Sequence, residues 1–224
     1  MLRARPAGMC RPSGWNAGPV QSEHEKGYRR SAGTARGKAR RQELLDRVVA
    51  DLAEHGLVDF SLRRAARAAG TTHKVLLYHF DGADDLLVQA VDRLRERRID
   101  NGLAAAATAA AHGTLAARVG ALWPVLVDPR FGHRVLEQST GLAMYDPARY
   151  AKFGREATEQ YLPALLSLCP PAWAEARRRE VAEMVLATLR GLLLDRVTGG
   201  DEAGTAAGLR ALVRALELEE ARDE

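Results

Sequence analysis

The chain has 224 residues, of which 46% are hydrophobic and 28% are charged, so it is long enough to bury a substantial core. No run of about 18 apolar residues is present, which excludes a membrane span, and the spacing of Cys10 and Cys169 fits neither a metal site nor a redox pair. A reduced, cytoplasmic setting is therefore expected. The net charge of +4 is unevenly placed, because residues 1–41 hold ten Lys/Arg and two Glu whereas the remainder is acidic.

The first segment, residues 1–36, is rich in Gly, Pro, Ser and Arg and lacks hydrophobic periodicity. This composition predicts a disordered basic N-terminal arm, and the apolar core of a signal peptide is missing from it. The arm could follow DNA phosphates. Its charge could equally reflect codon usage, since arginine outnumbers lysine 29 to 4 in the chain.

A first helix is expected from about Gly37 to His55, with Gly56 as its C-terminal stop. Apolar residues recur at helical spacing along it and predict one buried face. They are Leu44, Leu45, Val48, Val49 and Leu52.

Residues 61–80, SLRRAARAAGTTHKVLLYHF, predict two short helices joined by a tight turn. Ser61 can cap the first helix, and Gly70 can adopt the positive φ of the turn. Thr71 or Thr72 can cap the second helix. The apolar positions are Leu62, Ala65, Ala66 and Ala69 in the first helix and Val75, Leu76, Tyr78 and Phe80 in the second. This pattern is typical of a helix-turn-helix, whose second helix can enter a DNA major groove.

The rest of the chain predicts only helices, so the fold class is all-α. Asp81 is expected to cap a fourth helix, with Asp84 and Asp85 in its first turn. Further helices are expected near 114–127, 129–143, 147–168, 172–197 and 203–220, with Asp128-Pro129 and Asp146-Pro147 as start signals. Pro124 predicts a kink or an early end of the helix over 114–127, and Pro163 predicts a kink in the helix over 147–168.

The last two predicted helices are apolar on more than one side, which indicates burial on more than one side. Two copies of this pair could form a four-helix bundle between subunits, or the helices could be buried inside one subunit. Ala187 and Gly191 would allow close approach. The residues predicted to form the dimer interface are Val181, Val185, Leu189, Leu192, Leu209, Leu212, Val213 and Leu216.

No enzyme signature is present in the sequence. It has no glycine-rich phosphate loop, no H-E-x-x-H motif and no nucleophile elbow, and its six histidines are scattered. We therefore expect no catalytic residue, no metal and no cofactor.

The order of these features resembles the TetR family of transcriptional regulators. The resemblance is carried by residues 37–94, through GLVDFSLRRAARAAGTTHKVLLYHF and the following DLL, and more weakly by LRGLLLDRVTGGD at 189–201. It implies a basic arm over 1–36, a three-helix DNA-binding head with the helix-turn-helix over 37–82, and a helical ligand-binding and dimerisation domain over 83–224.

The resemblance also implies which residues of the head meet DNA. Ser61 would lie near a phosphate, Tyr78 and His79 would reach the backbone, and Lys38 would add a cation. Seven residues separate Gly70 from Tyr78, where most members have six, so the register of the base contacts stays open. The candidates for these base contacts are Thr71, Thr72, His73 and Lys74.

A cluster of large side chains between 123 and 161 is a second expected site. Six of the twelve aromatic residues of the chain fall there, and together with the resemblance they predict a small-molecule pocket, although an ordinary core has the same composition. The predicted apolar lining is Trp123, Phe131, Met144, Tyr145, Phe153 and Tyr161, and the predicted polar contacts are His133, Arg134, Gln138 and again Tyr145.

These observations together favour a one-component regulator. A homodimer would bind a palindromic operator on double-stranded DNA, with half-sites roughly 34–36 Å apart, and an unknown small-molecule effector would shift it between conformations. The resemblance implies repression. The rival hypothesis is a helical small-molecule-binding or interaction protein whose head no longer binds specific DNA. Ala83, which replaces a lysine usual in the family, and the extra residue before Tyr78 keep that rival open.

Overall fold

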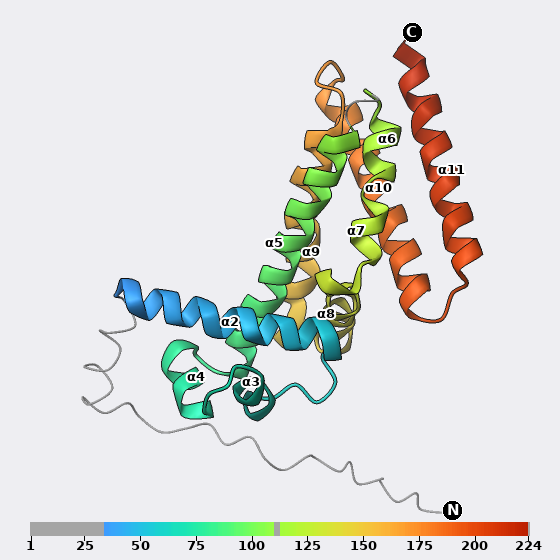
Figure 1. Cartoon of the computed structure of the whole chain (residues 1–224). Helices are drawn as coiled ribbons and strands as arrows, with labels where there is room; N and C mark the ends of the chain where they lie inside the picture. The colour runs from blue at the N-terminus through green and yellow to red at the C-terminus, as the bar shows by residue number, and fades with distance from the viewer. Residues whose placement is uncertain (1–33, 110–112, 224) are drawn as a thin grey trace, which may run out of the picture.

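The computed structural model describes residues 34–109 and 113–223, and in these two ranges the ordered elements are all helical (Figure 1). The expected disordered arm lies outside the described residues except for residues 34–36. The elements are α2 (Ala35–His55), α3 (Leu62–Ala68), α4 (His73–His79), α5 (Ala83–Ala109), α6 (Leu115–Gly120), α7 (Trp123–Val127), the 3-10 helix η2 (Pro129–Phe131), α8 (His133–Tyr145), α9 (Pro147–Leu168), α10 (Glu175–Val197), α11 (Glu202–Glu220) and the 3-10 helix η3 (Ala221–Asp223).

The head consists of α2, α3 and α4 packed on the first half of α5. Helix α2 begins at Ala35, two residues earlier than expected, because the Thr34 side chain accepts a hydrogen bond from the Gly37 amide. It ends where expected, at Gly56, whose φ of 73° lies in the left-handed region. Its five predicted apolar residues are buried in the head core.

The helix-turn-helix has the local geometry expected of it. Ser61 caps α3 by accepting from the Arg64 amide at 3.3 Å, and Thr72, rather than Thr71, caps α4 by accepting from the Val75 amide at 3.4 Å. Gly70 takes a φ of 62° in the turn. Each of the two helices has only seven residues, so neither is stable without packing against its neighbours.

Helix α5 connects the head to the rest of the molecule and belongs to two cores. Its first half, from Leu86 to Leu94, packs in the head core, which also receives Val135 and Leu136 from α8 and Phe153 from α9. Its second half contributes Ala106 to a separate core that α6, α9, α10 and α11 complete. Residue 83 is therefore the start of a shared helix, and side chains on both sides of it contribute to the head core.

The C-terminal helices follow the expected order with two differences. The helix expected over 114–127 is divided into α6 and α7, because Pro124 lacks the amide that would continue it. Asp128 caps a single 3-10 turn, and α8 starts after it at His133. Asp146 caps α9 as expected.

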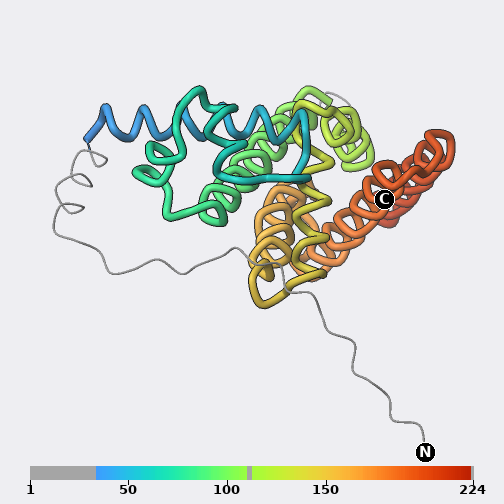
Figure 2. Tube along the Cα trace, turned by 90° about the horizontal axis from the view of Figure 1, so that it is seen from below, coloured from blue at the N-terminus to red at the C-terminus, as the bar shows by residue number. Residues whose placement is uncertain are grey.

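The head and the α10–α11 pair lie at opposite sides of the molecule (Figure 2). Within residues 34–109 and 113–223, no helix combines the length and apolar character needed to cross a membrane.

Candidate nucleic-acid interface and ligand cavity

Helix α4 is anchored on one side and open on the other. Leu76 is its single fully buried side chain, at 0% exposure. At 100° per residue, Lys74 and Tyr78 lie about 160° around the helix from Leu76, so they point away from the core. The exposed side chains of Val75 and Leu77 lie on the two flanks of this outer face. Because Leu76 is buried, Lys74 lies near the middle of the outer face of α4, which is the surface that would contact the major groove of DNA.

The predicted DNA contacts come from all three helices of the head and differ in exposure. Ser61, Thr72, His73 and Lys74 are exposed, as is Lys38 near the start of α2, while Thr71, Tyr78 and His79 are half-buried. Ser61 and Thr72 both use their hydroxyl oxygens as helix caps, so their hydroxyl protons are the groups left for a phosphate.

His79 has a different environment from the other predicted contacts. Its ring packs edge-on against Tyr78, with 4.7 Å between the centroids. Burial, followed by the positive charges of Arg41 and Arg40, lowers the pKa of His79 below its ordinary value. This environment disfavours the protonated form of the ring in the DNA-free protein.

Arg41 fixes the end of α4 and was not predicted as a functional residue. Its Nε donates to the His79 carbonyl at 3.0 Å, its Nη2 donates to the Gln89 side chain on α5, and its guanidinium lies 4.8 Å from the centre of the Phe80 ring. The sequence placed Arg41 in the basic stretch, and nothing in the one-dimensional pattern distinguishes it from the exposed arginines beside it.

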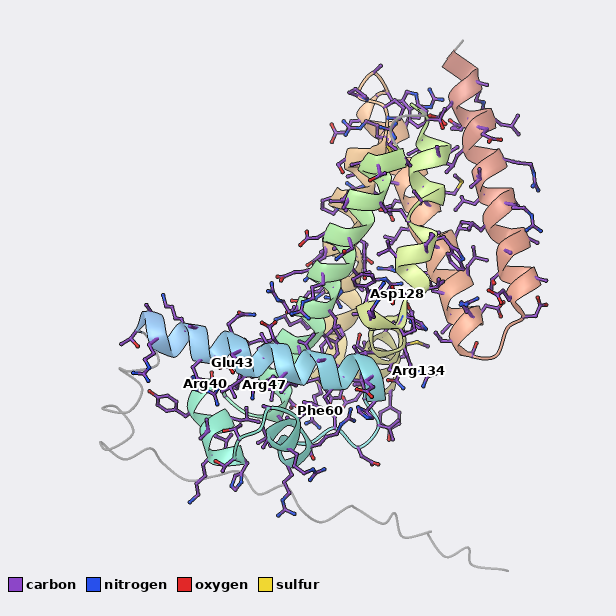
Figure 3. The ribbon with its side chains drawn as sticks, in the orientation of Figure 1. Arg40, Glu43, Arg47, Phe60, Asp128 and Arg134 are labelled. Atoms are coloured by element: carbon purple, nitrogen blue, oxygen red, sulfur yellow. The ribbon has the colours of Figure 1, made fainter. Side chains whose placement is uncertain are left out.

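The basic side of α2 is partly neutralised within the head (Figure 3). Glu43 lies between Arg40 and Arg47 and pairs with each at 2.6 Å, and the hydrogen bond from Arg40 lowers the pKa of Glu43. Arg47 also donates to the Ala69 carbonyl at the end of α3, at 3.0 Å. Arg40 and Glu43 therefore pair within α2, and Arg47 also joins α2 to the end of α3.

A cavity lies between α5, α8, α9 and α10. Its volume is about 80 Å³, counted as the space in which the centre of a water molecule fits, which is enough for several waters or a small ligand. Most of its wall is leucine, including Leu122, Leu126, Leu165, Leu186, Leu189 and Leu193. Arg95, Arg98, Glu137 and Arg190 are the charged side chains of the wall. No group of three or more His, Cys, Asp or Glu in the described residues is placed to hold a metal ion.

Of the nine residues predicted to contact a ligand, Tyr161 lines this cavity. Met144 and Tyr145 are 81% and 89% exposed at the end of α8, and Phe153 is buried in the head core. Trp123 packs against the C-terminal core, while Phe131, His133 and Arg134 are at the η2–α8 junction, outside the cavity wall.

Gln138, the remaining member of that set, contacts the head instead of the cavity. Its Oε1 accepts a hydrogen bond from the Leu57 amide at 2.9 Å, in the loop between α2 and α3. A Cβ at Gly56 would come within 2.9 Å of the same oxygen, so the glycine allows α8 to approach this closely. The neighbouring Glu137 lines the cavity, so consecutive residues of α8 contact the head and the cavity.

The arginines of the cavity were missed because arginine normally indicates a solvated surface. A signal was present in the spacing along α5. Val91, Leu94, Arg98 and Gly102 continue one buried stripe, and Arg98 occupies an apolar position of it. A charged residue at such a position is unusual enough to mark a site.

The predicted dimer residues lie mainly inside one chain. Val181, Val185, Leu189, Leu212 and Leu216 are buried in the C-terminal core, whereas Leu192, Leu209 and Val213 are partly buried. The outer face of α10 carries a different apolar stripe, made of Met184, Ala187, Gly191 and Leu194, all exposed.

No protein-family model matches the sequence, and no curated protein matches it. Solved structures are similar over most of the chain. A protein described as a transcriptional regulator from Streptomyces coelicolor A3(2) is 25% identical, with a TM-score of 0.59 over 79% of this chain and 98% of that one. A TetR-family transcriptional regulator from Rhodococcus sp. is 16% identical, with a TM-score of 0.59 over 81% of this chain and 98% of that one. The multidrug binding protein EbrR, complexed with imidazole, is 22% identical, with a TM-score of 0.54 over 80% and 90% of the two chains.

These similarities define an all-helical protein in which a helix-turn-helix head precedes a helical C-terminal domain. The chain has the fold of the TetR-family transcriptional regulators, which confirms the resemblance seen in its sequence at the level of fold.

Proposed function

We propose that the protein is a transcriptional regulator that binds operator DNA as a homodimer and responds to a small molecule. The observation that carries the proposal is the outer face of α4, where Lys74 stands opposite the buried Leu76 on a helix-turn-helix. The described part of the head, residues 34–82, holds nine Lys/Arg against six Asp/Glu, which suits a polyanionic partner.

Base contacts are assigned to the side chains around Lys74. Lysine donates to the guanine edge of the major groove, and the apolar flank formed by Val75 and Leu77 suits the thymine methyl group. Thr72 and His73, at the start of the helix, lie where recognition helices make their contacts.

Lys74→Ala is expected to weaken binding to the DNA upstream of the protein's own gene by about 1–3 kcal/mol. Fluorescence anisotropy at several salt concentrations, with a scrambled duplex as competitor, measures both the affinity and the sequence preference. Arg155→Ala is the matched control, because Arg155 is an exposed cation on α9, outside the helix-turn-helix. Equal binding of the wild-type protein to upstream and scrambled DNA would reject the regulator in favour of a ligand-binding protein with an inactive head.

The dimer interface is assigned to the exposed stripe of α10 and the outer face of α11. The two helices lie side by side, with α11 at one edge of the molecule (Figure 1). Leu194 is 51% exposed and Leu218 on α11 is 72% exposed. Small residues on both helices, among them Gly191 and Ala211, leave room for a second pair of helices to approach closely. Repression follows if this dimer covers a promoter.

Leu194→Glu is expected to convert a dimer into a monomer, because it places a charge in an apolar interface. Light scattering at micromolar concentration measures the mass directly. Val58→Glu, at an exposed apolar residue of the head, is the control and is expected to remain dimeric. A monomeric wild-type protein would contradict the assignment.

A further inference from the structure

We propose that the cavity binds a small organic monoanion, a carboxylate with an apolar body, through Arg98 and Arg190. The assignment of this anion as the effector rests on the proposed function, whereas the binding itself does not. The inference comes from the charges, the unused hydrogen-bonding atoms and the apolar wall of the cavity.

The cavity wall has an excess of positive charge. Arg95 and Arg98 on α5 are 1% and 2% exposed, and Arg190 on α10 is half-buried, whereas Glu137 is the one carboxylate that lines the cavity. A buried charge is costly unless an opposite charge or several hydrogen bonds compensate it. The wall therefore has more buried guanidinium groups than carboxylates to balance them.

The three arginines differ in how far the protein satisfies them. Arg95 has carboxylate partners, with Nη1 at 3.1 Å from Asp92 and 4.0 Å from Glu156. Arg98 donates to the Leu126 carbonyl at 3.1 Å, and Arg190 donates to the Thr158 hydroxyl at 3.1 Å, which are both neutral acceptors. Among the described residues, no carboxylate comes within 4.0 Å of the guanidinium of Arg98 or Arg190.

Unused polar atoms accompany these two arginines. Arg98 Nε, Arg190 Nη2 and the Tyr161 hydroxyl are buried and have no hydrogen-bond partner within the described part of the chain. Arg95 Nε also has none, but the charge of Arg95 is balanced by Asp92. The Arg98 guanidinium also lies over the Tyr161 ring, at 5.9 Å from its centre. A carboxylate can accept from several donors at once, so a single anionic group would satisfy donors from α5, α9 and α10 together.

Glu137 does not compensate the positive charges of Arg98 and Arg190. Burial raises the pKa of Glu137, although Arg98 and Arg190 act in the opposite direction. Burial also lowers the pKa of Arg190, which shows that its charge is poorly solvated where it stands. Glu137 forms no ion pair within 4.0 Å with Arg98 or Arg190, and its replacement by a neutral side chain is expected to favour an added anion.

The remainder of the wall specifies the body of the ligand. The leucines of α7, α9 and α10 offer no hydrogen bonds, so a polyanion or a sugar would lose its hydration without compensation. A short alkyl or aryl chain would instead bury apolar surface against them. Octanoate is a suitable probe, with octan-1-ol and octylammonium as matched neutral and cationic compounds.

Isothermal titration of the full chain, without DNA, tests the proposal. Octanoate is expected to bind at least about tenfold more tightly than octan-1-ol, because charge-assisted hydrogen bonds form only with the anion. Glu137→Gln is expected to tighten octanoate binding several-fold. Arg190→Gln is expected to weaken octanoate binding about tenfold and to weaken octan-1-ol binding much less, because the alcohol carries no charge.

The controls separate charge recognition from damage to the fold. Arg134→Gln removes an exposed arginine of α8 outside the cavity wall and should leave all three affinities unchanged. Thermal unfolding of each variant reports whether it still folds, and the gain of affinity in Glu137→Gln cannot arise from misfolding. Equal binding of octanoate and octan-1-ol, tighter binding of octylammonium, or no binding of octanoate at millimolar concentration would overturn the proposal.

The outcome is independent of the DNA experiment. A protein that binds octanoate but no operator would keep the anion site and lose the proposed function. A protein that binds its operator but not octanoate would keep the proposed function and lose the anion site.

Discussion

Leu76→Ala is expected to lower the free energy of unfolding by about 2–5 kcal/mol and to abolish operator binding. Leu76 is the one side chain of α4 with 0% exposure, and a helix of seven residues has no stability of its own. Removal of the anchor therefore leaves a cavity in the head core and frees the recognition helix at the same time. Urea denaturation measures the first effect, and anisotropy with upstream DNA measures the second.

The adjacent Leu77→Ala variant is the matched control. It makes the same chemical change one position along, at a side chain that is 49% exposed, so stability should change by less than about 0.5 kcal/mol. Its operator affinity reports only the loss of one flank contact. If Leu76→Ala and Leu77→Ala had equal effects on unfolding, the orientation of α4 described above would be wrong.

The parts of the head that could be predicted depend on local chemistry. Ser61 and Gly70 act through their own backbone or through amides within three residues, so their roles follow from the sequence alone. The same holds for Asp146, which caps α9. Arg41 could not be assigned in this way, because its partners His79 and Gln89 are brought to it only when α4 and α5 pack on α2.

The cavity depends on packing between helices and was largely missed for that reason. Tyr161 of the aromatic cluster lines the cavity, whereas Phe153 of the same cluster fills the head core, and composition cannot distinguish these two environments. Tyr145 is a tyrosine like Tyr161, but its side chain is exposed to solvent at the end of α8. The environment of each aromatic side chain depends on which other residues pack against it, and those residues lie elsewhere in the chain.

The apolar pattern of the last two helices shows the same limit. A helix that is apolar on several sides must be covered on several sides, and the sequence leaves open whether its own chain or a second copy covers each side. Val185 and Leu189 are covered by the chain itself, and Met184 and Leu194 are not. Only the three-dimensional packing separates these two stripes, which alternate along α10.

Gln138→Leu is expected to uncouple the cavity from the head. Glu137 lines the cavity and Gln138 holds the Leu57 amide at 2.9 Å, so a ligand that shifts α8 moves the loop between α2 and α3. Energetic coupling between two sites of this kind is typically about 1–3 kcal/mol, or a change of about 5–150-fold in operator affinity on ligand binding. Without the hydrogen bond, most of that change should disappear while ligand affinity in the absence of DNA is retained.

The measurement is the ratio of operator affinities with and without saturating octanoate, in the wild-type protein and in two variants of position 138. Gln138→Glu retains an oxygen that can accept from the Leu57 amide, so it should keep most of the ratio that Gln138→Leu loses. Both variants change the same side chain against Gly56, where α8 approaches the head most closely, so steric effects on the loop are matched. A full ratio in Gln138→Leu would show that the signal passes through α5 or α9, since both helices contribute side chains to both cores. A reduced ratio in Gln138→Leu, restored in Gln138→Glu, would assign the coupling to this hydrogen bond.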